Sequence, residues 1–566
     1  MMFRKPNAIG ELRTYDLEVI NNYYVWRPWL PLARFFQVTF KFLKFFTALQ
    51  FDRLWGHPDQ SPVKRASQLR QILTDLGPGT IKIGQALSTR PDLVPQSYMY
   101  ELTKLQDNLP PFDKKLARTI IEEQLRAPID AYFSEFSPDP VAAASLGQVH
   151  RARLRTGEEV AVKVQRPNLR GMITLDLFLL RRLAVWFGPY LPLNLGFNLD
   201  FIVDEFGIKL FEEINYVQEG KNCERFAQYF AQDPNVCVPK IYWHASAEKV
   251  LTLEWINGIK LTDVQQIQQT GLDIERLIRI GVESGLKQLL EFGFFHADPH
   301  PGNLFALKDG RIAYIDFGMM DQLSEANKEN LVDALVHLMN REYEALSGDF
   351  IRLGFLAPTT DIKVIVPALE KVLGDLFGAR VSQVNFKAVT DQFSDLVYEY
   401  PFRVPAQFAL IIRSLVTQEG VALSLDPDFQ ILKVAYPYVA RRLLTDESPR
   451  IRQRLIEILF KSGKFQWQRL ENLITIAGTS GAHFDLGPTA RLGVRYLLSE
   501  EGRPVRERLA LALTQDDRLH ARELFNLWHL LAPRIPARDL ARNVLQEMWD
   551  VTRERLSPVA TLPRSS

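Results

Sequence analysis

The stretch FFHADPHPGN at residues 294–303, followed by IDFG at residues 315–318, decides how this sequence is interpreted. Asp298 precedes Asn303 by five positions, and Asp316 follows Asp298 by 18 positions. The apolar runs NLFAL and RIAYIDF in this region predict a short β-hairpin. Carboxylate and amide oxygens are ligands that Mg²⁺ accepts alongside phosphate oxygens. The pattern therefore predicts a metal-assisted phosphate site.

This spacing matches the catalytic loop and the Asp-Phe-Gly motif of protein kinases. In that pattern Asp298 orients or deprotonates the acceptor hydroxyl, while Asn303 and Asp316 hold the Mg²⁺ that bridges the phosphates. An Asp-Phe-Gly alone is common by chance, whereas both motifs at this separation are not. We therefore expect these three residues to be catalytic, with ATP and Mg²⁺ as cofactors.

His296, Asp298 and His300 allow a second interpretation, because they form a His-x-Asp-x-His pattern. On a strand these side chains would share one face and would suit zinc. Pro299 and Pro301 favour a loop instead, and no cysteine or further histidine cluster completes a zinc ligand set. The kinase pattern is the stronger interpretation.

An alanine-rich segment, VAAASLGQV at residues 141–149, stands where a kinase carries its glycine-rich loop. Small residues let backbone N–H groups approach phosphates, but alanine lacks the dihedral freedom of glycine, so this loop should be stiffer. The apolar strand VAVK then ends at Lys163, which is expected to hold the α- and β-phosphates. Taken alone, an ordinary hairpin with an exposed lysine fits equally well. The residues at the three glycine positions and the valine position are Ala142, Ala144, Gly147 and Val149.

Two further parts of a kinase site have candidates. A kinase needs a glutamate to fix the strand lysine, and Glu219 lies on a predicted helix that would also carry Glu213. Either glutamate could instead be a solvated carboxylate. The segment LEWI follows an apolar strand and predicts the hinge that contacts adenine through backbone groups. Its expected contact residues are Glu254, Trp255 and Ile256.

The segment after Gly318 is short. A predicted helix, SEANKENLVDALVHLM, follows almost directly, without a long activation segment or an Ala-Pro-Glu motif. That segment is the platform on which protein kinases lay a peptide. Its absence favours a small or lipidic acceptor, or water, over a protein substrate.

These patterns predict an α+β fold, namely a bilobal protein-kinase-like fold with an N-terminal helical extension and a C-terminal all-helical region. Strands are expected within residues 133–165, 238–243 and 249–256, before a mostly helical remainder that contains the hairpin. The expected parts are a basic, aromatic-rich segment at 1–64, a helical extension at 65–130, an N-lobe with inserted helices at 131–255, a C-lobe with the catalytic loop at 256–440, and a helical region at 441–566.

The amino-acid composition indicates the broad class of protein. The chain has 566 residues with 46% hydrophobic and 24% charged side chains, as in soluble globular proteins of more than one domain. A net charge of +1 gives no argument for a nucleic-acid partner. Two cysteines, Cys223 and Cys237, cannot form a disulfide framework, so a reducing, cytoplasmic compartment is expected. Neither a signal peptide nor a transmembrane helix is predicted.

Residues 21–55 stand out as aromatic-rich and basic. Lys41 and Lys44 interrupt the apolar run, which disfavours a membrane-spanning helix. A helix that lies in a membrane interface fits this composition, and so does a helix packed on the protein's own core. The first alternative predicts a peripheral membrane protein.

The sequence resembles the UbiB/ADCK family of atypical kinases over about residues 65–440, through the motifs above and through KIGQ at residues 82–85, which matches the family's K-x-G-Q. The resemblance implies that Lys82 and Gln85 belong to an extension that folds over the nucleotide site. From the residues alone, KIGQ is an ordinary helix surface. The family's E-x-D motif falls on Glu213 to Asn215, so asparagine replaces an aspartate, which weakens a metal-binding or acceptor-blocking role there. Nucleotide-site positions implied by the family are Ala142, Ala143, Ala144, Ser145, Lys163 and Glu219.

The resemblance also implies a function. It predicts ATPase or unorthodox kinase activity with ATP and Mg²⁺, in support of prenylquinone or other isoprenoid-lipid metabolism at a membrane surface. The long helical tail is similar to that of members from photosynthetic bacteria and plastids. Two alternatives remain at this point: a non-catalytic, ATP-gated scaffold of a lipid-biosynthetic complex, and an orthodox protein kinase.

Overall fold

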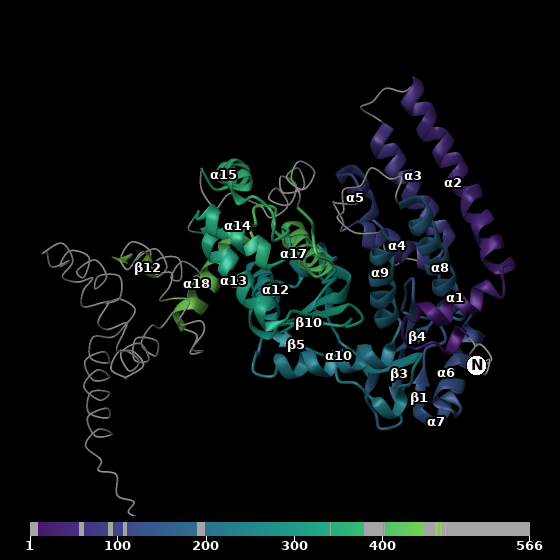
Figure 1. Ribbon diagram of the computed structural model, residues 1–566. Coiled ribbons are helices and arrows are strands. Elements are labelled where there is room, and N and C mark those ends of the chain that lie inside the picture. The colour runs from purple at the N-terminus through teal and green to yellow at the C-terminus, as the bar shows by residue number, and fades with distance from the viewer. Residues whose placement is uncertain are drawn as a thin grey trace, which may run out of the picture. The chain divides into compact units, whose positions relative to one another are not determined.

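Most of the chain is described by the computed structural model (Figure 1). The described residues are 9–55, 61–88, 94–105, 110–188, 199–339, 341–378, 400, 402–445 and a few positions between 455 and 470. The chain divides into two units, residues 1–429 and 430–566. The expectations for the first eight residues and for most of residues 441–566 lie outside the described residues.

An antiparallel sheet forms the small lobe, in the order β1-β3-β4-β6 with β2 paired to β3. The turn between β3 and β4 contains Gly157, whose φ of 104° favours glycine. Helix α6 (Lys114–Leu125) packs its apolar face on this sheet, and Ile121, Phe133 and Val162 are fully buried between them. The strand bounds are β1 (Phe133–Phe136), β2 (Ala142–Ala143), β3 (Gly147–Leu154), β4 (Glu159–Gln165) and β6 (Val250–Glu254).

Three inserted helices stand between β4 and β6. They are α8 (Leu169–Phe187), α9 (Leu199–Glu213) and α10 (Tyr216–Tyr229). Helices α8 and α9 lie side by side, and α10 contacts β6 (Figure 1). Glu213 therefore ends one helix and Glu219 lies in the next, so the expectation of a single helix carrying both is wrong.

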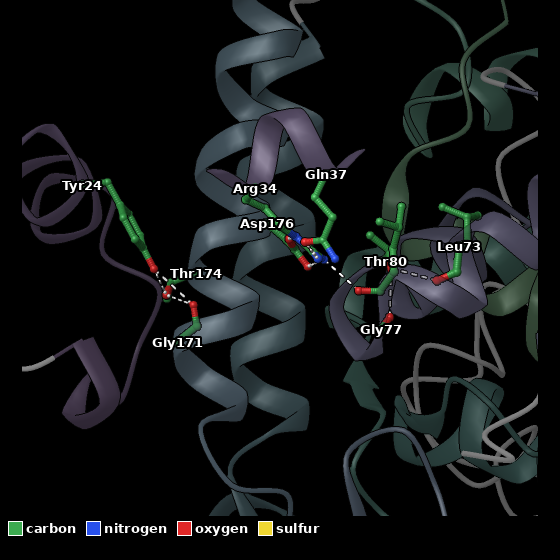
Figure 2. A network of polar contacts seen from close by, with 10 residues as sticks. Tyr24, Arg34, Gln37, Leu73, Gly77, Thr80, Gly171, Thr174 and Asp176 are labelled. Carbon is green, nitrogen blue, oxygen red and sulfur yellow. Dashed lines mark hydrogen bonds and ion pairs between the residues drawn. The ribbon is translucent and has the colours of Figure 1, made fainter. Parts of the chain in front are cut away.

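The N-terminal extension is helical, as expected. Helix α2 packs against α3 and α8, and α4 packs against α3, α5 and α8. A buried ion pair, Arg34 to Asp176 at 2.7 Å, ties α2 to α8 (Figure 2). Arg34 also donates to the Leu76 carbonyl at the end of α3. The bounds are η1 (Ile9–Glu11), α1 (Leu17–Val25), α2 (Trp29–Trp55), α3 (Ser61–Leu76), α4 (Pro78–Leu87), α5 (Gln96–Leu102), α6 (Lys114–Leu125) and α7 (Ile129–Tyr132).

Short strands and helices build the large lobe. One sheet has the order β5-β10-β9-β7, and β8 pairs with β11 beside it. The strands are β5 (Val236–Cys237), β7 (Ile259–Lys260), β8 (Phe294–His296), β9 (Leu304–Ala306), β10 (Ile312–Tyr314) and β11 (Met320–Gln322). The helices are α11 (Val264–Gln269), α12 (Ile274–Lys287), the π-helix η4 (Gln288–Phe292), η5 (Pro301–Asn303), α13 (Glu325–Met339), α14 (Tyr343–Arg352), α15 (Ile362–Gly378) and α17 (Ala406–Leu425). The short helix η3 (Trp243–Ala245) instead contacts β6 of the small lobe.

Two secondary-structure expectations are wrong. No strand covers residues 238–243: β5 ends at Cys237, Pro239 lacks the N–H that a strand ladder needs, and only an isolated bridge forms at Ile241. The second unit is not all helical. Beside α18 (Leu432–Thr445) it contains the hairpin β12 (Phe460–Lys461) and β13 (Lys464–Phe465), whose strands flank a Ser-Gly turn signal in the sequence.

One helical segment among the described residues, Gln407–Leu425 in α17, is long and apolar enough to cross a membrane. Half of that segment is buried inside the protein, as in the core helix of a folded domain.

Gly84 sets how closely α4 approaches its neighbours. A Cβ atom at this position would lie 2.3 Å from Leu105 Cδ1 and 2.9 Å from Leu73 Cδ1. Both leucines are buried in the cluster that joins α3, α4 and α5. The glycine is therefore required by space, because no side chain fits between these helices without displacing the cluster.

We predict that Gly84→Val destabilises the first unit by about 1–3 kcal/mol, the usual cost of overpacking a core. The measurement is the shift in the denaturant midpoint of the full chain. The matched control is Gly420→Val, also inside a helix, where no atom lies within 4 Å of the place that a Cβ would take. Equal shifts for the two variants would contradict the role of close packing at Gly84.

Candidate active site

Lys163 lies at the centre of the site. Strand β4 directs its ammonium between two carboxylates, with Nζ 2.5 Å from Glu219 Oε1 and 3.4 Å from Asp316 Oδ2. Glu219 comes from α10, and Asp316 follows β10 in the large lobe. The lysine therefore joins the two lobes, and it is not the exposed lysine of an ordinary hairpin.

Charge pairing sets the ionisation of these groups. Burial opposes the charge of Lys163, but the carboxylates of Asp316 and Glu219 raise its pKa above the ordinary value. Burial also opposes the charge of Asp316, yet the Lys163 ammonium and the Gly318 N–H lower its pKa to about 2. Burial raises the pKa of Glu219, and the lysine offsets part of that effect. At neutral pH Asp316 is therefore an anion, ready to bind a cation.

The break between α9 and α10 lets two glutamates reach the same region. Asn215 caps α10, because its side-chain oxygen accepts a hydrogen bond from the Gln218 N–H. Asparagine and aspartate both suit this position. Glu213, just before the cap, pairs with Lys82 at 2.5 Å between Nζ and Oε1.

The KIGQ segment is buried, so its interpretation as an ordinary helix surface is wrong. Lys82 and Gln85 are only 5% and 8% exposed. Gln85 donates from Nε2 to the Leu105 carbonyl at 2.8 Å, which anchors α4 to the residues after α5. Through the Lys82–Glu213 ion pair, the N-terminal helical extension contacts the end of α9, next to the Lys163–Glu219 ion pair.

The loop that carries Asp298 is held by His296. Its Nδ1 accepts the Asp298 N–H at 3.1 Å, so the ring proton is on Nε2 and is donated to the Asp316 carbonyl at 2.8 Å. Burial lowers the pKa of His296, which favours this neutral form. One histidine thus ties the loop of Asp298 to the Asp-Phe-Gly segment. Both of its nitrogens are used, which leaves none for zinc.

No cluster of three metal-ligating His, Cys, Asp or Glu side chains occurs in the part of the chain that the structure describes. Asp316 and Asn303 both line the cavity described below. One carboxylate and one amide suit Mg²⁺, which usually takes its remaining ligands from water and substrate phosphates.

Arg413 is a site residue that sequence reasoning missed. It lies on α17 and its Nη2 is 2.7 Å from Asp298 Oδ2. The two residues are 115 positions apart, and no motif in the sequence marks the arginine. Only the tertiary structure reveals that the expected catalytic aspartate is charge-paired.

A large cavity of about 1440 Å³ runs past these groups. Its lining includes most of the predicted site residues. These are Ala142, Ala143, Ala144, Val149, Lys163, Glu254, Trp255, Ile256, Asp298, Asn303 and Asp316, together with Gln85. Six predicted residues do not line it: Ser145, Gly147, Glu219, Lys82, Glu213 and Asn215. Behind the cavity wall, Glu219, Lys82 and Glu213 form ion pairs and Asn215 caps a helix.

The alanine-rich segment is a tight turn between β2 and β3. The Ala144 N–H donates to the Gly147 carbonyl at 2.8 Å. Gly147 is required by space, since a Cβ there would lie 2.4 Å from the Tyr216 hydroxyl and 2.5 Å from the Val164 carbonyl oxygen. The glycine fixes the turn against the sheet, while the alanines face the cavity.

The hinge offers one free backbone donor. The Trp255 N–H is bound to the Glu159 carbonyl at 3.0 Å. The Ile256 N–H has no hydrogen-bond partner among the described residues, and Ile256 lines the cavity. Of the three predicted hinge residues, Ile256 is thus the one whose N–H is free for an adenine ring.

Comparisons with known proteins agree with this geometry. The ABC1 atypical kinase-like domain matches residues 104–349, and the UbiB helical domain matches residues 369–430. The uncharacterised protein slr1919 of Synechocystis is 58% identical over 98% of both chains. The chloroplast protein ACTIVITY OF BC1 COMPLEX KINASE 1 of Arabidopsis thaliana is 47% identical, over 90% of this chain and 77% of that protein.

A solved structure, the complex of Rv3197 with erythromycin from Mycobacterium tuberculosis, is 27% identical with a TM-score of 0.45, over 64% of this chain and 92% of that one. The expected α+β, kinase-like fold is confirmed by the matched domains and by the helical regions on either side. The chain belongs to the ABC1/UbiB family of atypical kinase-like proteins, with ACTIVITY OF BC1 COMPLEX KINASE proteins of chloroplasts among its homologues.

Proposed function

We propose that this protein binds Mg-ATP and transfers its γ-phosphoryl group to a small or lipidic acceptor or to water. The observation that carries the proposal is Lys163 between Glu219 and Asp316, beside a cavity that also exposes Asp298 and Asn303. This set supplies a phosphate-binding cation, a metal-binding pair and an acceptor-facing carboxylate, which are the parts that phosphoryl transfer needs.

Each residue has a distinct task in this proposal. The Ile256 N–H binds adenine, and the alanine turn at residues 142–144 lies over the phosphates. Lys163 binds the α- and β-phosphates, with Glu219 fixing its position. Asp316 and Asn303 would hold Mg²⁺, which neutralises charge on the β- and γ-phosphates when bound.

We predict that Asp316→Asn lowers the rate of ATP turnover at least about a hundredfold, because it removes the anion that holds the metal and balances Lys163. The measurement is Mg²⁺-dependent phosphate release by the full chain. Asp309→Asn, at an exposed aspartate between β9 and β10, is the matched control and should retain wild-type turnover. Unchanged turnover in Asp316→Asn would overturn the enzymatic proposal.

For the acceptor, we propose an isoprenoid lipid such as a prenylquinone precursor. The cavity exceeds the ~300–1,000 Å³ of ordinary small-molecule sites, which leaves room for a second ligand beside a nucleotide. Beside polar side chains such as Thr417 and Glu419, helices α5 and α17 contribute a group of apolar side chains to its lining. These wall residues are Met99, Tyr100, Leu102, Ile412, Val416 and Leu423. An apolar chain would fit there, whereas an ordered peptide platform is missing, since only six residues separate Gly318 from α13.

We predict that Val416→Trp fills the apolar part of the cavity and leaves the nucleotide part open. Basal ATP turnover should stay within about twofold, while any stimulation by vesicles that contain a prenylquinone precursor should be lost. Val364→Trp, at an exposed position on α15, is the control for adding an indole. Stimulation that survives in Val416→Trp would place the acceptor elsewhere.

A second candidate is a non-catalytic, ATP-gated scaffold. The observation that favours it is the Arg413–Asp298 pair, because an aspartate bound to a guanidinium is a poorer acceptor for a substrate proton. Tight nucleotide binding without turnover, with precursor-containing vesicles present, would support the scaffold over the enzyme. An orthodox protein kinase is the weakest alternative, because the peptide platform is missing.

A further inference from the structure

One face of helix α2 is apolar and exposed along most of its length. Trp29, Phe36 and Phe40 are 62%, 66% and 68% exposed. The exposed residues recur every three or four positions, or five at the last step, and so share one side of the helix. They form the α2 stripe: Trp29, Leu32, Phe36, Phe40, Leu43, Phe46 and Phe51. From end to end the stripe spans about 33 Å at 1.5 Å per residue.

The opposite face of α2 is fixed to the protein, so the helix cannot turn to bury the stripe. Arg34 is bound to Asp176 with the two side chains only 14% and 6% exposed. Phe45 is buried, and Lys41 pairs with Asp75 at the end of α3. Figure 1 shows α2 running beside α3, and Figure 2 shows Arg34 and Asp176 pointing toward each other. The stripe therefore stays outward in the folded unit.

The charged residues that α2 itself carries before Asp52 are all basic. No aspartate or glutamate occurs between Glu18 and Asp52, a segment that contains Arg27, Lys41 and Lys44. Lys44 is exposed on the flank of the stripe. Asp75 of α3 neutralises Lys41, so Lys44 is the exposed basic residue beside the stripe. An aromatic apolar face with this basic flank suits the surface of a membrane with anionic lipids. We propose that α2 docks the protein on such a surface, lying in the plane of the membrane.

A second copy of the chain fits this face less well. A helical seam between copies usually uses aliphatic side chains and pairs of opposite charge beside them. The α2 stripe is mainly aromatic, and Asp75, the carboxylate beside its flank, is already paired with Lys41 of the same copy. Spanning the bilayer is also disfavoured, because Arg34 and Lys41 are held in ion pairs on the protein side of the helix.

The test is flotation of the full-length protein with vesicles of phosphatidylcholine, either alone or mixed with phosphatidylglycerol. Wild type should float with the mixed vesicles. The double variant Phe36→Asp/Phe40→Asp should lower the partition coefficient at least about tenfold, because two large apolar side chains leave the interface. The matched control, Val364→Asp, places the same charge on an exposed apolar position of α15 and should float like wild type.

Lys44→Glu provides a milder second variant that leaves the stripe intact. It should weaken binding to mixed vesicles and have little effect on vesicles of phosphatidylcholine alone. Circular dichroism of each variant shows whether the fold is retained, and its ATP turnover without vesicles shows whether the proposed function is retained. Weaker flotation with both retained reports loss of the docking surface alone. Wild type that stays unbound, variants that float like wild type, or a wild-type dimer that the double variant dissociates would each overturn the membrane proposal.

Discussion

The ion pairs of Lys163 determine the rest of the site. Its ammonium touches a carboxylate from each lobe, Glu219 at 2.5 Å and Asp316 at 3.4 Å. A buried charge is tolerated only when it is paired, so the cap that ends α9 and starts α10, the register of β4 and the hairpin before Asp316 must all be in place together. The site is therefore a property of the whole fold of the first unit and cannot be assigned to one loop.

Charges from outside the kinase-like core complete this arrangement. Lys82 from α4 pairs with Glu213, and Arg413 from α17 pairs with Asp298. With Lys163 there are thus three cations facing four carboxylates, Glu213, Glu219, Asp298 and Asp316. Burial raises the pKa of Glu219 to about 7, so the three cations nearly balance the carboxylates that are charged at neutral pH. Asp316 and Asn303 are the candidate metal ligands that line the cavity. The two helical additions thus contribute to the electrostatics of the site and do more than cover it.

The sequence was informative where chemistry is local. The spacing of Asp298, Asn303 and Asp316 and the strand before Lys163 depend on short loops and hairpins, and the structure has them as expected. The sequence did not predict the features that depend on contacts between segments far apart in the chain. The cap at Asn215 divides an apparently continuous helix, Gly84 is small because two leucines meet there, and Arg413 becomes a site residue only when α17 folds against the catalytic loop. Gly84 and Asn215 lie in the K-x-G-Q and E-x-D motifs, but neither motif predicts the leucine contacts or the helix cap, and no motif marks Arg413.

The Arg413–Asp298 pair bears on how an acceptor could enter. Arg413 occupies Oδ2 of Asp298, so an acceptor hydroxyl that uses this oxygen must replace the guanidinium, and breaking a partly buried ion pair is costly unless the arginine finds another anion. On the proposed function, a bound triphosphate would supply that anion in the same cavity, since Arg413 and the alanines at residues 142–144 both line it. Nucleotide binding would then draw Arg413 away and free Asp298 for the acceptor. On the function proposed above, nucleotide would then bind first and the acceptor second.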